Sequence, residues 1–101
     1  MRDYFFVDDL IDGIYRASLY TGDFTVFNFG SGIGCSLNDL VDIIRTVVGR
    51  DLKVNYKTGR IFDVPKIILN ISRAKTVLSW EPVTPLNIGI QKTWEYVKML
   101  L

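Results

Sequence analysis

Hydrophobic and polar positions repeat with two different periods along this chain of 101 residues, which predicts strands and helices in alternation. Short apolar runs predict strands at 2–7, 24–29, 52–56 and 66–71. The run at 24–29 is apolar on both faces, which is typical of a strand inside a sheet that is covered on both sides. The run at 52–56 alternates, so we expect one of its faces to be in water.

Apolar residues spaced three or four positions apart predict four helices between these runs. We expect the first helix to begin at Asp8 and to end before Gly22. Asp8 and Asp9 are then interpreted as first-turn carboxylates that cap free N–H groups and complement the helix dipole, and not as an acid–base pair.

The start signals of the other helices are local. Ser36 followed by Asp39 resembles a capping box, and that helix ends at Gly49. A short helix at 73–79 is capped by Ser72, and the last helix opens at 84–85 with proline in its first position. Strands and helices in alternation predict the α/β class.

The composition excludes several kinds of function. Twelve basic against eleven acidic residues give a net charge of +1, so we expect neither nucleic acid nor a membrane surface as partner. The chain has no histidine and only Cys35, which argues against a metal site and an internal disulfide. It has no apolar run of membrane length and no signal-like start, so we expect a cytoplasmic protein.

The segment Gly30-Ser31-Gly32-Ile33-Gly34-Cys35 lies between a predicted strand and a predicted helix. A dinucleotide-binding loop has this context, but its third glycine belongs where Cys35 stands. The alternative, which we favour, is a tight turn that joins a buried strand to a helix. Cys35 as a nucleophile lacks the usual histidine base.

The stretch 57–65 lies between two predicted strands and carries Arg60 and Asp63. A guanidinium group matches a phosphate, and a carboxylate suits sugar hydroxyls, so the pair is compatible with a nucleotide sugar. On spacing alone a solvated surface turn is the more common explanation.

Several segments, in order along the chain, together carry a family resemblance. They are Arg2-Asp3-Tyr4 with Val7-Asp8-Asp9-Leu10, Phe27-Asn28-Phe29-Gly30-Ser31-Gly32 with Ser36-Leu37, Gly59-Arg60 with Asp63-Val64-Pro65, Ser72-Arg73-Ala74-Lys75, Leu78-Ser79-Trp80-Glu81-Pro82, Leu86 with Gly89-Ile90, and Thr93-Trp94. The chain resembles the C-terminal part of NAD-dependent sugar-nucleotide epimerases and dehydratases, the extended short-chain dehydrogenase/reductases, and is UDP-glucose 4-epimerase-like. It departs from the family at Ser79, where glycine is usual, and at Phe62, where a small or polar residue is usual.

The resemblance implies the site residues. In the family, Arg2 and Arg60 would hold the nucleotide diphosphate and Asp63 would approach the ribose, whereas the glycine-rich segment would be a late strand-to-helix turn. The strand at 24–29 would join the Rossmann sheet of the full-length enzyme. No catalytic residue and no bound cofactor are implied for this chain, although NAD serves the full-length enzyme.

The family's cofactor fingerprint and its Tyr-x-x-x-Lys pair have no counterpart in this sequence. We therefore expect residues 1–101 to be the nucleotide-sugar-binding portion without the N-terminal NAD-binding Rossmann domain, inactive as an isolated chain. We also expect a homo-oligomer formed through exposed sheet surface. The alternatives are a non-catalytic interaction module, a fragment of a sugar-nucleotide dehydratase, or a truncated product without a role of its own.

Overall fold

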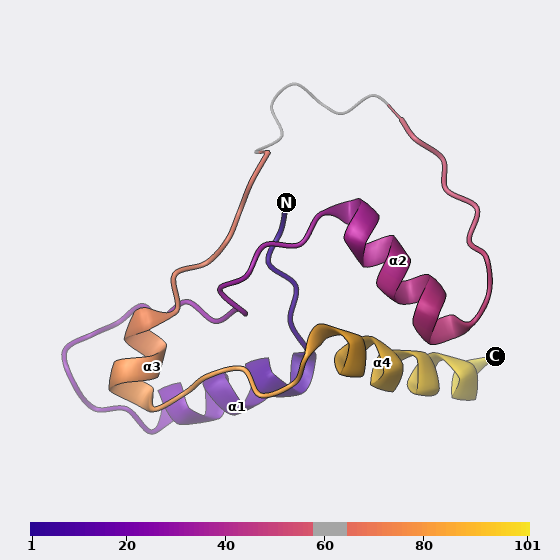
Figure 1. Ribbon diagram of the computed structural model, residues 1–101. Coiled ribbons are helices and arrows are strands. Elements are labelled where there is room, and N and C mark those ends of the chain that lie inside the picture. The colour runs from indigo at the N-terminus through magenta and orange to yellow at the C-terminus, as the bar shows by residue number, and fades with distance from the viewer. Residues whose placement is uncertain (58–64) are drawn as a thin grey trace.

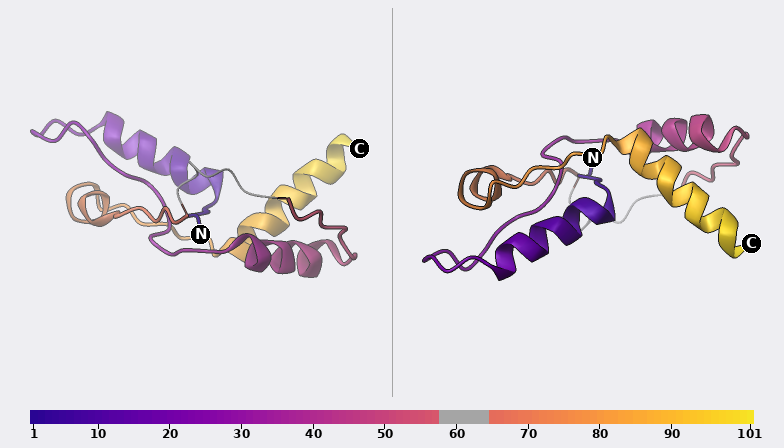
Figure 2. Two further views of the ribbon diagram at one scale, coloured as in Figure 1. Left: turned by 90° about the horizontal axis from the view of Figure 1, so that it is seen from above. Right: turned by 90° about the horizontal axis from the view of Figure 1, so that it is seen from below.

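The computed structural model describes residues 1–57 and 65–101, and the helices in these ranges are α1 (Val7–Ser18), α2 (Leu37–Val48), α3 (Ser72–Leu78) and α4 (Leu86–Leu100). They form two pairs, with α1 beside α3 and α2 beside α4 (Figure 1). The molecule is flat, 48 × 38 × 19 Å (Figure 2), and its radius of gyration is 16.1 Å. A compact domain of this length would have a radius of gyration of about 13 Å, so the arrangement is open.

The four predicted helices are confirmed, with shifts at their ends. The Oγ of Ser36 accepts the N–H of Asp39 at 3.1 Å, and Gly49 ends α2 in the left-handed region at φ 74°. Ser72 is the first residue of α3 and makes no cap, and Pro85 precedes α4 instead of opening it. The first helix is shorter than predicted, because α1 begins at Val7 and ends at Ser18.

The predicted strands at 2–7, 24–29, 52–56 and 66–71 are wrong as paired strands within the described residues. These segments run without a ladder, and one isolated antiparallel bridge joins Arg2 to Cys35. A strand needs a neighbour that exchanges N–H···O=C bonds with it, and an apolar run alone cannot supply that neighbour. The segments therefore have strand-like sequences without the sheet that would complete them.

The core lies around Trp80, which is 1% exposed and is packed with Ile71, Ala74 and Leu78. The rings of Phe5 and Phe29 meet the indole edge to face, with centroids 6.2 and 4.9 Å away. This geometry is favourable for aromatic pairs beyond the area they bury. Trp80 thus gathers residues from the start, the middle and the end of the chain.

The buried carboxylate of Asp9 does not cap α1, contrary to the prediction. Its two oxygens accept the backbone N–H and the hydroxyl of Thr84, at 3.1 and 3.3 Å. Its backbone carbonyl accepts the indole N–H of Trp80 at 2.8 Å. Asp9 therefore ties α1 to the segment that leads into α4.

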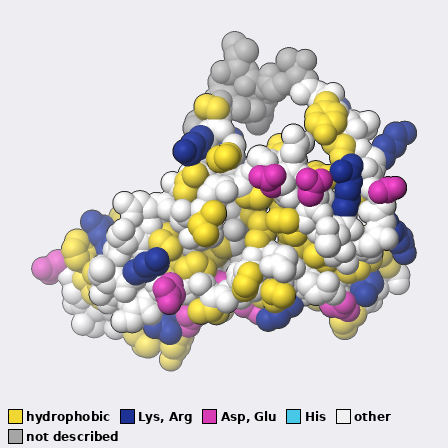
Figure 3. All heavy atoms as spheres, in the orientation of Figure 1, with side chains coloured by type: hydrophobic (Ala, Val, Ile, Leu, Met, Phe, Trp, Pro, Cys, Tyr) yellow, Lys and Arg dark blue, Asp and Glu magenta, His cyan; other side chains and the backbone are white. Residues whose placement is uncertain are grey.

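Hydrophobic side chains reach the surface in several places (Figure 3). On α1, Val7, Ile11, Ile14 and Tyr15 are 55% to 63% exposed and share one face of the helix by their spacing. In the unpaired segment 24–29, Val26 is 63% exposed. We call the four exposed side chains of α1, without Val26, the α1 apolar stripe.

Candidate functional site

The carboxylate of Asp3 is bonded to two other segments of the chain. Its Oδ1 accepts the backbone N–H and the hydroxyl of Ser31, both at 2.7 Å. Its Oδ2 accepts the N–H groups of Gly32 and Leu69, at 2.9 and 3.2 Å. We call this arrangement the Asp3 clamp. It joins the N-terminal segment to the glycine-rich turn and to the segment before α3.

The clamp favours the ionised form of its carboxyl group. Burial would raise the pKa of Asp3, but the hydrogen bonds from Ser31, Leu69 and Gly32 outweigh it and hold the pKa below its ordinary value. The sequence pattern predicts no role for Asp3. The signal that could have found it is a carboxylate placed directly between Arg2 and a purely apolar run.

The Asp3 clamp also explains the glycine-rich turn. A dinucleotide-binding loop offers its free N–H groups to a pyrophosphate, whereas here the N–H groups of Ser31 and Gly32 are donated to Asp3. Gly32 has φ +73°, which allows the chain to curl around the carboxylate. The residues of this turn do not fit a pyrophosphate, and the interpretation as a tight turn is the one that the structure favours.

Arg2 is held beside the glycine-rich turn by its backbone. Its N–H donates to the carbonyl of Cys35 at 3.0 Å, and the N–H of Cys35 donates back at 2.9 Å. The guanidinium group of Arg2 donates an exposed hydrogen bond to the carbonyl of Met1 at 3.0 Å. It lines a cavity of about 360 Å³, the Arg2 pocket, whose walls are Met1, Arg2, Tyr4, Cys35, Leu37 and Pro65.

The predicted site residues Arg60 and Asp63 lie outside the described residues. Pro65 follows that stretch directly, and its carbonyl accepts the amino group of Met1 at 2.8 Å. The N–H of Ile67 donates to the carbonyl of Met1 at 3.0 Å. Pro65 and Ile67 are therefore fixed beside the residue that precedes Arg2.

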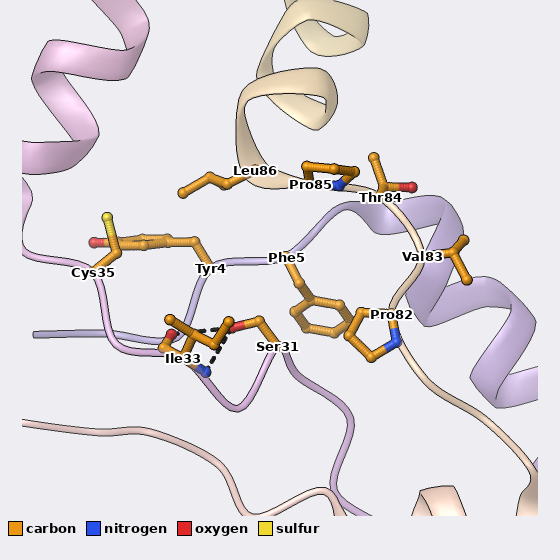
Figure 4. A pocket seen from close by; sticks show the side chains of 10 residues that line it. All are labelled: Tyr4, Phe5, Ser31, Ile33, Cys35, Pro82, Val83, Thr84, Pro85 and Leu86. Carbon is orange, nitrogen blue, oxygen red and sulfur yellow. Dashed lines mark hydrogen bonds between the residues drawn. The ribbon is translucent and has the colours of Figure 1, made fainter.

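A second cavity of about 290 Å³ lies on the other side of Tyr4, between the N-terminal segment and the approach to α4. Figure 4 shows its walls, in which the ring of Phe5 lies near Pro82 and the side chain of Tyr4 extends toward Cys35. The walls are Tyr4, Phe5, Ser31, Ile33, Cys35, Pro82, Val83, Thr84, Pro85 and Leu86. Among the described residues, no carboxylate, lysine or arginine lines this cavity, and its polar side chains are those of Tyr4, Ser31, Cys35 and Thr84.

In residues 1–57 and 65–101, the side chains of His, Cys, Asp and Glu do not gather in threes at a spacing that suits a metal ion. In the same ranges, each helix is too short or too polar to cross a bilayer.

No protein-family model matches the chain. It is 36% identical over 97 residues to the UDP-glucose 4-epimerase of Mycolicibacterium smegmatis, and the alignment covers 96% of this chain and 31% of that enzyme. The solved UDP-glucose 4-epimerase of Thermotoga maritima with UDP-glucose matches 97% of this chain and 31% of its own, with a TM-score of 0.88 and 38% identity.

A third match concerns the fold. MoeE5, solved in complex with UDP-glucuronic acid and NAD, covers 98% of this chain and 33% of its own, with a TM-score of 0.90 and 24% identity. The chain thus spans about a third of the length of these proteins. The matches confirm the resemblance read from the sequence, and the α/β fold class of a part of an extended short-chain dehydrogenase/reductase.

Proposed function

We propose that this chain, a homologue of UDP-glucose 4-epimerases and related NAD-dependent sugar-nucleotide enzymes, is the nucleotide-sugar-binding portion of such an epimerase. The observation that carries the proposal is the Arg2 pocket, which holds a guanidinium group next to Pro65, the residue that follows the stretch of Arg60 and Asp63. The similar enzyme of Thermotoga maritima was solved with UDP-glucose. A UDP-sugar carries a diphosphate, which is the group that a guanidinium fork recognises best.

The proposed contacts divide between two segments. Arg2 and Arg60 bind the diphosphate by charge-assisted hydrogen bonds, and Asp63 accepts hydrogen bonds from the ribose hydroxyls. The wall of the Arg2 pocket also contains Tyr4 and Leu37, which place apolar surface beside the proposed diphosphate position. We assign the chain no catalytic residue.

The chemistry of the parent enzyme would then be supplied elsewhere. In the parent reaction, NAD oxidises a carbon of the sugar and the hydride returns, for instance to the opposite face. None of the tyrosines of this chain is followed four residues later by lysine, and the glycine-rich turn has its N–H groups on Asp3. The isolated chain therefore binds no NAD and has no turnover in this proposal.

The first prediction is that calorimetric titration of the purified chain detects UDP binding and no NAD binding. Replacing Arg2 or Arg60 with alanine removes charge-assisted bonds of about 2 kcal/mol, so the dissociation constant for UDP rises by about thirtyfold. Arg50→Ala is the matched control, because Arg50 is an exposed arginine outside the Arg2 pocket. The affinity of the Arg50→Ala variant for UDP should stay within about twofold of that of the unchanged chain.

This experiment can contradict the proposal in two ways. A folded chain that ignores UDP, or that binds UDP equally well without Arg2 and Arg60, is not a nucleotide-sugar-binding portion. Turnover of a UDP-sugar with NAD by the purified chain would show that the missing fingerprint and Tyr-x-x-x-Lys pair are dispensable.

The second prediction is that the chain forms a homo-oligomer. The α1 apolar stripe and Val26 expose hydrophobic side chains, and in the described residues the segment 24–29 pairs with no strand, which favours association. Ile14→Lys and Val26→Lys place charges on these surfaces, and sedimentation should then show a shift toward monomer. Met99→Lys, at an 82% exposed position near the end of α4, is the control and leaves the oligomer unchanged. A monomer at high concentration would contradict this prediction.

A different class of function remains the runner-up, a non-catalytic interaction module that keeps the fold. The exposed apolar surfaces favour it. If the chain is such a module, its Arg60→Ala variant assembles in the same way as the unchanged chain. Neither of the two binds UDP. If the parent enzyme is a dehydratase instead of an epimerase, the proposed contacts of Arg2, Arg60 and Asp63 stay the same.

For either class of function we propose the cytoplasm as the compartment, in keeping with a single free thiol.

A further inference from the structure

We propose that Asp3 is a positioning residue of the nucleotide site, because its carboxylate fixes where the guanidinium group of Arg2 lies. The inference rests on the proposed function, in which Arg2 binds the diphosphate. We assign Asp3 no contact with the ligand, since its carboxylate already accepts four hydrogen bonds from Ser31, Gly32 and Leu69. It acts through its neighbour in the chain.

The N-terminal segment lies between two other segments and is bonded to both. On one side, Arg2 exchanges two backbone hydrogen bonds with Cys35. On the other side, Met1 is bonded to Pro65 and Ile67. The Asp3 clamp joins the same three segments at the residue that directly follows Arg2. Arg2 therefore lies between bonded neighbours in the sequence, and its backbone has little freedom to shift.

The clamp is specific for a carboxylate. Three of its four hydrogen-bonding groups are backbone N–H donors and the fourth is the hydroxyl of Ser31, and they converge on two oxygens that can only accept. A Cβ on Gly30 would lie 2.8 Å from the Oδ2 of Asp3, so the turn is closed tightly around the group. An asparagine would direct its NH₂ at a donor on one side, so it could not keep all four bonds.

Loss of the clamp is expected to displace Arg2. Consecutive Cα atoms are about 3.8 Å apart, so a shift of residue 3 moves residue 2 with it. Binding groups need to be held within about 0.5 Å of their productive positions, and side chains whose supports are removed drift by more than that. The affinity for the diphosphate should therefore fall although Arg2 is still present.

The test compares Asp3→Asn with Asp9→Asn. Asp9 is buried and its carboxylate accepts two hydrogen bonds from Thr84, and it does not line the Arg2 pocket. UDP affinity is measured by calorimetry at a temperature where circular dichroism shows each variant to be folded. We expect the dissociation constant to rise by about tenfold or more for Asp3→Asn and by less than about twofold for Asp9→Asn.

Amide hydrogen exchange gives a second measurement that needs no ligand. In Asp3→Asn the amides of Arg2 and Cys35 should exchange faster than in Asp9→Asn, because the segment that carries them has been loosened. Equal UDP affinities in the two folded variants, or equal exchange at Arg2 and Cys35, would overturn the inference. If the unchanged chain does not bind UDP, both proposals are overturned. If Arg2→Ala weakens UDP binding and Asp3→Asn does not, only the inference about Asp3 is overturned.

Discussion

Replacing Trp80 with alanine should lower the free energy of unfolding by about 4 kcal/mol, the range for deleting a buried tryptophan side chain. Trp80 is 1% exposed and touches Phe5 and Phe29 through edge-to-face contacts. Its indole N–H is also the donor to the buried carbonyl of Asp9. The substitution leaves a cavity and removes a buried hydrogen bond in the same place, so both costs add.

The loss should be large relative to the stability of the whole chain. Small domains are stable by about 5–15 kcal/mol, and in the described residues of this chain few hydrophobic side chains are fully buried. Denaturant unfolding followed by circular dichroism measures the change. Trp94→Ala is the matched control, because Trp94 is a half-buried tryptophan on α4 with Lys98 over its ring at 5.6 Å. If both variants lose the same free energy, the core is not centred on Trp80.

Acidification is the second large effect, and it should act through the Asp3 clamp. The hydrogen bonds from Ser31, Leu69 and Gly32 hold the pKa of Asp3 below its ordinary value of 3.8, in spite of burial, which raises it. A carboxyl whose pKa is lower in the folded state stabilises that state above its unfolded pKa. This contribution is complete above about pH 4 and is lost as the pH falls from 3.8 through the lower folded pKa.

Asp3→Asn isolates this effect from the other carboxylates. At neutral pH the substitution should cost about 3 kcal/mol, since it removes charge-assisted hydrogen bonds and directs an NH₂ at a donor. The difference in unfolding free energy between the two chains should then shrink as the pH falls below 3.8, because the unchanged chain loses its charge. Denaturant titrations at several pH values measure the difference. A difference that stays constant down to the acid limit would show that the charge of Asp3 does not stabilise the fold.

The helices were predictable because their signals are local. The cap at Ser36, the left-handed glycine at Gly49 and the repeat of apolar residues all lie within a few residues of the helix they define. Ser79 is another local signal at the end of a helix. Its φ of 52° lies in the left-handed region that favours glycine, and glycine is the residue that the family usually has there.

The pairing of the strands and the long-range hydrogen bonds of Asp3 and Asp9 could not be predicted from local signals. The run at 24–29 has a strand-like sequence, but pairing depends on a neighbour that the sequence of the run does not contain. Asp9 looked like a cap because it sits in the first turn of a helix, whereas its bonds go to Thr84. Asp3 likewise bonds to segments that sequence spacing cannot connect with it. Family resemblance supplied Arg2, Arg60 and Asp63, and it gave no role to the residue that holds Arg2 in place.

The hydrogen bonds of Asp3 and Asp9 join residues that are far apart in the sequence, and this separation has a kinetic consequence. Asp3 meets partners 28 to 66 residues away, and Asp9 meets Trp80 and Thr84 across 71 and 75 residues. Helices form within about a microsecond, but contacts of this separation need large loops to close first. The chain should therefore fold at the slow rate of a protein with high contact order, although its regular structure in the described residues is helical.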